Sequence, residues 1–153
     1  MKERTNLGKE MQFIAVENSF EAFEKSHDGG KGDNSLDNKS YRGGCLVNLV
    51  KLNNWLNKFN KEEAREMLEE AKYLLEYVVS KRKEELNGIE GGNEKYDNLE
   101  EKLAKDYTRL ASSKFHLADS YITEDIEERK KLYIEVIDSN NKSIEHRSTT
   151  PEV

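Results

Sequence analysis

The residue pair best placed to do chemistry in this sequence is Arg109 with His116, in the stretch RLASSKFH. On a helix, seven residues bring two side chains to nearly the same azimuth but leave them about 10 Å apart along the axis. The two could therefore serve one reaction only across a dimer or by reaching inward. We favour the plainer interpretation, in which Arg109 faces solvent and His116 lies on the groove side of a repeat helix.

The R-x6-H spacing is similar to the R-x4-6-H signature of the HEPN-type helical ribonucleases. That resemblance implies RNA cleavage by Arg109 and His116. Leu110 departs from the pattern, because the family places a polar residue such as asparagine after the arginine. A HEPN-like ribonuclease is therefore an alternative, and we expect a protein that is not an enzyme and has no catalytic residues.

Other reactive residue types stand in unsuitable surroundings. His27, Asp28 and Asp33 lie in a glycine-rich stretch without the paired spacing of a zinc site or the twelve-residue pattern of a calcium loop. GGKGDNS lacks the order of a phosphate-binding loop, and no strand precedes it. Cys45 stands beside Leu46 and Val47 and is predicted to be a packed hydrophobic residue. We expect no metal and no cofactor.

Composition favours a soluble, mostly helical protein. The 153 residues include 31 acidic and 25 basic side chains, a net charge of -6, and a single proline at Pro151. An acidic balance argues against a dedicated nucleic-acid binder, which needs a basic face to release phosphate counterions. No apolar run approaches the roughly 20 residues that span a bilayer, and the lone cysteine cannot form an internal disulfide. We expect a cytoplasmic location without membrane contact.

The spacing of apolar residues predicts an all-α fold. Helices are expected at residues 10–25, 44–58, 61–86 and 99–122 and from residue 124 onward, with Asn60 and Thr123 as N-caps. Beyond Val79 the run SKRKEEL loses its apolar face, so this end of the helix is predicted to project into solvent. The predicted units are an N-terminal helix at 1–25, a flexible linker at 26–40, a helical repeat domain at 41–147 and a disordered tail at 148–153.

A shift of the chain by 65 residues aligns two similar segments, LVKLNNWLNKFNKEEAREMLEEA and KFHLADSYITEDIEERKKLYIEV. The offset pairs Val50 with Phe115 and Asn60 with Asp125, and it keeps the turn between the helices in register. A hairpin with so short a turn cannot cover its own apolar face. We therefore predict antiparallel hairpins that stack as repeats around a shared interior, with a single helical bundle as the alternative.

Stacked hairpins generate a groove lined by the first helix of each pair. In the first copy the polar residues beside the apolar stripe are Lys51, Asn54 and Lys58, and the 65-residue offset maps them to His116, Asp119 and Thr123. Arg109 and Ser112 extend the same row. The predicted partner-binding residues are Lys51, Asn54, Lys58, Arg109, Ser112, His116 and Asp119.

Small residues that alternate with large ones, such as Ala64 and Ala71 around Leu68, resemble the tetratricopeptide pattern. The sequence lacks that family's glycine and terminal proline positions, and the 65-residue spacing is nearly double the usual period. Three further segments carry a resemblance to a known family: LNKFNKEEAREMLEEAKYLL, NGIEGGNEKYDN and KFHLADSYITEDIEERKKLYIEVI. Over about residues 41–147 the chain resembles the KIF-binding protein family, although that family's proteins are several times longer. The resemblance implies binding of kinesin motor domains and control of microtubule-based transport. A scaffold or assembly subunit is a third possibility.

Overall fold

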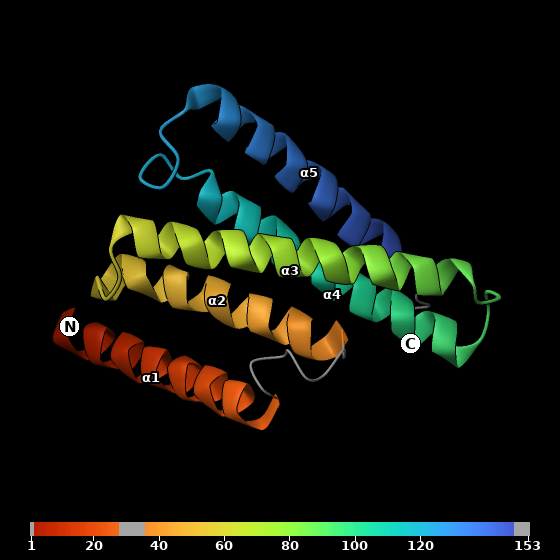
Figure 1. Ribbon diagram of the computed structural model, residues 1–153, viewed down its shortest axis with the longest axis horizontal. Helices are drawn as coiled ribbons and strands as arrows, with labels where there is room; N and C mark the ends of the chain where they lie inside the picture. The colour runs from red at the N-terminus through yellow and green to blue at the C-terminus, as the bar shows by residue number, and fades with distance from the viewer. Residues whose placement is uncertain (1, 28–35, 149–153) are drawn as a thin grey trace.

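The computed structural model describes residues 2–27 and 36–148. Within these residues the chain forms five helices, and consecutive helices run in opposite directions as hairpins (Figure 1). Each helix packs on the next one along the chain, and α2 also packs against α4. The all-α prediction is confirmed. The helices are α1 Lys2–His27, α2 Leu36–Leu56, α3 Lys61–Asn87, α4 Glu94–Leu117 and α5 Ile126–Ser148.

Short polar side chains fix where three of these helices begin. Asn60 Oδ1 accepts from the Glu63 amide at 2.8 Å, as predicted, and Asn93 caps α4 in the same way. The predicted cap at Thr123 is wrong: Asp125 caps α5 by accepting from the amide three residues on, at 2.7 Å. Thr123 is instead buried in the link before α5.

Two helix boundaries differ from prediction because polar residues find partners inside the fold. α2 begins at Leu36 rather than near residue 44, since Asp37 and Ser40 bind side chains of α3 and α4. The predicted linker at 26–40 is therefore helical at 26–27 and 36–40, and residues 28–35 lie outside the described ranges. α4 begins at Glu94 and ends at Leu117, about five residues earlier than predicted at each end. Residues 149–153 of the predicted tail are likewise outside the described ranges.

The interior is shared by the hairpins of α2 with α3 and of α4 with α5. One apolar cluster draws Leu46 from α2, Leu68 from α3, Leu117 from α4 and Leu132 from α5. At Gly43 the backbone of α2 approaches α3 so closely that an added Cβ would lie 2.9 Å from Leu75 Cγ.

α1 covers the outer side of α2. Phe13 is buried against Leu49 and Leu52, and its ring centre lies 5.7 Å from that of Phe59. The opposite face of α1 exposes Leu7 and Met11. α1 is therefore held to the stack by one apolar stripe.

The second half of α3 does not project into solvent, contrary to the prediction from SKRKEEL. Arg82 and Leu86 are both buried, and α4 packs along this half of the helix. Leu86 joins a cluster with Leu99 and Leu103 of α4. In the sequence, Arg82 interrupts the apolar stripe of α3. In the fold, its charge is balanced by the carboxylates of Asp37 on α2 and Asp106 on α4.

The 65-residue repeat is preserved at the turns and lost along part of the stripes. α3 and α5 begin 65 residues apart, and their caps, Asn60 and Asp125, make equivalent hydrogen bonds. By contrast, Val50 is buried while its counterpart Phe115 is exposed. The two hairpins therefore share a local design but differ in which side chains they bury. No helix of the described ranges is long and apolar enough to cross a membrane.

Candidate functional site

Three surface hollows follow one another along α2. The first, of 370 Å³, lies where Asp37 and Ser40 meet α3 and α4, and the second, of 240 Å³, shares Tyr41 and Arg109 with it. The third, of 380 Å³, shares Asn48 with the second and reaches Lys51. From residue 37 to residue 51 the helix rises about 21 Å. The hollows thus form one groove along α2, which we call the α2 groove.

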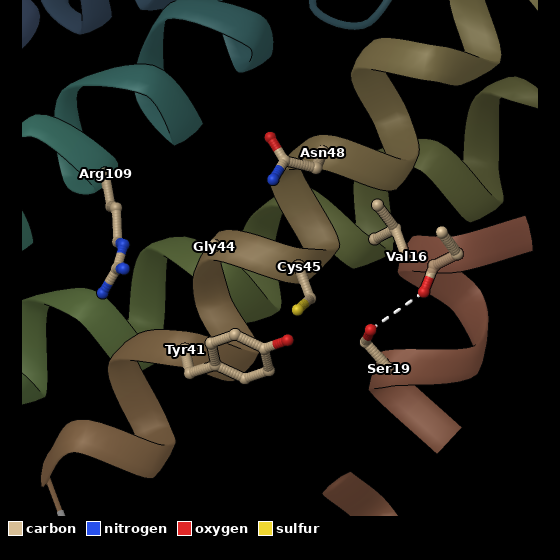
Figure 2. Close-up of a pocket in the computed structure, with 8 residues that line it drawn as sticks. Val16, Ser19, Tyr41, Gly44, Cys45, Asn48 and Arg109 are labelled. Atoms are coloured by element: carbon tan, nitrogen blue, oxygen red, sulfur yellow. Dashed lines mark hydrogen bonds between the residues drawn. The ribbon is translucent and has the colours of Figure 1, made fainter. Parts of the chain in front are cut away.

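Figure 2 shows the middle of the α2 groove. Tyr41, Gly44, Cys45 and Asn48 of α2 form its floor, and Val16 and Ser19 of α1 stand on one side. Arg109 reaches across from α4 on the other side. A Cβ at Gly44 would lie 3.3 Å from Arg109 Nε, so the glycine lets the arginine lie close to α2.

Burial sets the ionisation of the thiol on the floor of the groove. Cys45 is buried, and this burial raises the pKa of its thiol. The raised pKa keeps the thiol protonated at neutral pH, which fits the predicted role of Cys45 as a packed residue.

A buried network of charged side chains closes one end of the groove. Ser40 Oγ donates to Asp106 Oδ1 at 2.5 Å, and Arg82 Nε lies 2.5 Å from Asp106 Oδ2. Arg82 Nη2 also donates to Asp37 Oδ1 at 2.6 Å, and Lys102 Nζ donates to Asp37 Oδ2 at 2.9 Å. The network therefore joins α2, α3 and α4 through two carboxylates.

The two carboxylates of this network have pKa values shifted in opposite directions. Burial raises the pKa of Asp106, although the hydroxyl of Ser40 and the guanidinium of Arg82 act against this rise. Hydrogen bonds from Arg82 and then Lys102 lower the pKa of the more exposed Asp37. Asp37 is thus held as an anion, whereas Asp106 depends on its partners for its charge.

Arg109 borders this network without joining an ion pair. Its Nη1 donates to Ser40 Oγ at 2.7 Å, so Ser40 accepts from Arg109 while it donates to Asp106. Within the described residues no carboxylate forms an ion pair with Arg109. A guanidinium carries five N–H donors. Arg109 therefore has donors left for a ligand in the groove.

The predicted partner-binding residues fall into separate places. Arg109 and Lys51 line the α2 groove, and His116 lies close enough to Lys51 for that charge to affect it. Burial first, and then Lys51, lowers the pKa of His116, so its imidazole is neutral at pH 7. Ser112 stands between Arg109 and His116 on the same face of α4, at i, i+3 and i+7.

The remaining predicted residues have other roles or no described contact. Lys58 forms an ion pair with Glu10 of α1 at 3.1 Å, and Asp119 accepts from the Tyr121 amide at 2.8 Å in the turn after α4. Asn54 is exposed on α2.

The structure gives Arg109 and His116 different neighbours. Arg109 is hydrogen-bonded to Ser40 near the start of α2, whereas the His116 ring packs edge-on against Phe115, with ring centres 5.5 Å apart. Both side chains come from α4, two helical turns apart. The contacts of the described chain do not bring the two side chains to a common point.

Sequence reasoning missed four of the six cationic side chains that line this groove. The cations of α4 at positions 102, 105 and 109 are spaced at i, i+3 and i+7, so Lys102, Lys105 and Arg109 share one face of the helix. This basic face could have been recognised from the sequence. Arg82 and Ser40 could not be found in this way, because each lies on a different helix from the groups that it binds. The described residues contain no cluster of three or more His, Cys, Asp or Glu side chains that could hold a metal ion.

Fold and groove together define a protein of stacked antiparallel helical hairpins with a charged groove along the first helix of a hairpin. No protein-family model matches the chain, and neither curated proteins nor solved structures yield a significant match.

Proposed function

We propose that this chain is a non-catalytic protein-interaction module and that a segment of the partner docks in the α2 groove. The observation that supports this proposal is the continuity of three hollows over about 21 Å of helix. A groove of this length accommodates about six residues of an extended chain, at roughly 3.5 Å each. Its lining combines apolar side chains, such as Val16 and Leu52, with polar groups, as peptide-binding surfaces do.

For the partner itself we propose a kinesin motor domain in the cytoplasm, on the strength of the resemblance to the KIF-binding protein family. Binding there would regulate microtubule-based transport. The tetratricopeptide-like pattern supports the same class of function, because stacked helical hairpins present concave surfaces to protein partners.

The test measures binding of the full chain to a purified kinesin motor domain by biolayer interferometry. Asn48→Trp places an indole in the groove, since Asn48 is exposed and lines two of the hollows. Asn141→Trp adds the same group to an exposed position of α5 and serves as the matched control. Circular dichroism of both variants checks that they fold.

We expect Asn48→Trp to weaken binding at least tenfold and Asn141→Trp to leave it unchanged. Absence of binding by the wild-type chain would remove the kinesin proposal. Equal binding by both variants would remove the groove as the docking site.

A specific observation favours a second candidate function, that of a scaffold subunit that stacks on another copy of the chain. α1 and α5 lie at opposite ends of the helix stack (Figure 1), and each exposes an apolar stripe. The α5 stripe of one copy could continue the stack onto the α1 stripe of the next. Light scattering at about 100 μM tests this candidate. A solution mass of 17.8 kDa, the mass of one chain, would contradict it. The exposed residues are Leu7, Met11 and Ile14 on α1 and Ile126, Ile134, Ile137 and Ile144 on α5.

A further inference from the structure

The α2 groove is basic although the protein is acidic. Among the described residues that line its three hollows, six side chains are cationic and two are carboxylates. The whole chain has a net charge of -6. Positive charge is therefore concentrated along α2. The cations are Lys9, Lys51, Arg82, Lys102, Lys105 and Arg109.

The two carboxylates of the groove already have cationic partners. Asp106 binds Arg82, and Asp37 binds both Arg82 and Lys102. Arg109 and Lys51 form no ion pair with any residue in the described part of the chain. These two cations are therefore the ones that an incoming anion would meet.

We propose that the α2 groove selects an acidic segment of its protein partner, with one carboxylate bound by Arg109 and a second by Lys51. This inference rests on the proposed function, because it names the chemistry of the segment that docks there. Arg109 lies over Gly44, and Lys51 stands seven residues further along α2, a rise of about 10 Å. In a polyproline II segment three residues rise about 9 Å, and side chains three positions apart lie on the same face. The preferred ligand thus carries two acidic side chains three positions apart.

A protein segment suits this site better than a nucleic acid. The cationic excess follows one helix, whereas a nucleic acid presents phosphates in continuous series and needs an extended basic face. Of the cations that line the groove, Arg109 and Lys51 are the two without an ion pair among the described residues, too few to neutralise a run of phosphates.

The experiment uses the full chain and two fluorescein-labelled peptides, GSEAGEAG and its uncharged counterpart GSQAGQAG, in a buffer of low ionic strength. Fluorescence anisotropy gives the affinity of each. We expect the glutamate peptide to bind at least tenfold more tightly than the glutamine peptide. Arg109→Gln and Lys51→Gln should each remove most of that difference. Lys130→Gln on the exposed side of α5 is the control and should preserve it.

Three results would overturn the inference: equal affinity of the two peptides, including no binding by either; a preference that survives both Arg109→Gln and Lys51→Gln; or tighter binding of a single-stranded oligonucleotide of the same length. These failures are distinguishable from failure of the proposed function. If Asn48→Trp still blocks the protein partner while the two peptides bind alike, the groove remains the docking site and only its preference for acidic segments is removed.

Discussion

Replacing Arg82 by alanine should destabilise the fold more than any other single change to a charged residue of the groove. The Arg82 side chain is 5% exposed, and that of its partner Asp106 is 2% exposed. Without the guanidinium, Asp106 would retain the hydroxyl of Ser40 but lose its paired cation. Removing one member of a buried ion pair costs about 3–5 kcal/mol, because the other charge stays buried without compensation.

Urea unfolding followed by circular dichroism measures this cost. With a slope of about 2 kcal/mol per molar urea, a loss of that size lowers the midpoint by roughly 1.5–2.5 M. Lys83→Ala removes the neighbouring, exposed cation of α3 and should change the free energy of unfolding by less than about 0.5 kcal/mol. A double variant, Arg82→Met with Asp106→Leu, removes both charges and should recover much of the loss.

The cost of Arg82→Ala should shrink as the pH falls. Burial already raises the pKa of Asp106 in the folded protein, and loss of Arg82 raises this pKa further. A carboxyl whose folded pKa lies above its unfolded value destabilises the fold at pH 7 and ceases to do so once the folded state takes up the proton. Hydrogen bonds from Arg82 and Lys102 lower the pKa of Asp37, so its stabilisation is present above the unfolded value of about 4 and is lost below it.

Protonation of Asp106 makes wild type and variant more alike at pH 4 than at pH 7, and loss of the Asp37 contribution adds to this effect below about pH 4. A cost below about 1 kcal/mol at pH 7, or a cost that grows as the pH falls, would refute the reasoning from burial.

Other substitutions test the helix termini and the packing. Asn60→Ala and Asp125→Ala should each lower the free energy of unfolding, measured with urea, by about 1 kcal/mol, because each removes an N-cap. Two unequal losses would contradict the equivalence of the two turns. Gly43→Ala should cost about 1–3 kcal/mol, because the new Cβ meets Leu75 Cγ at 2.9 Å, and a neutral result would show that Leu75 shifts freely. Leu68→Ala, at a fully buried position, should cost about 3–5 kcal/mol in the same assay, and a loss below about 1 kcal/mol would place Leu68 outside the core.

The helices and their hairpin arrangement could be predicted because the signals are local. Apolar residues that recur every three to four positions mark a buried helix face, and a side chain such as Asn60 satisfies amides within its own turn. The prediction of the α5 cap failed because Thr123 and Asp125, two residues apart, could each serve as an N-cap. Packing decides between them: Thr123 is buried, and Asp125 caps the helix.

Two of the six cationic side chains that line the α2 groove were predicted from the sequence. Lys51 and Arg109 were predicted from their positions beside the apolar stripes of two helices, and both line the groove. Lys58 was predicted in the same way, yet it forms an ion pair with Glu10 of α1. The position of α1 on α2 was not predicted, because an amphipathic stripe shows that a helix packs but not on which neighbour it packs.

The sequence alone determined that this protein is built of antiparallel helices and where two of its turns fall, because these properties depend on neighbours within a few residues. Only the tertiary structure decided the charge of the groove. Ser40, Arg82 and Asp106 come from three helices and are separated by 24 to 66 residues along the chain. Packing brings them within hydrogen-bonding distance, and this packing converts an apparently solvent-exposed arginine into the buried centre of a network.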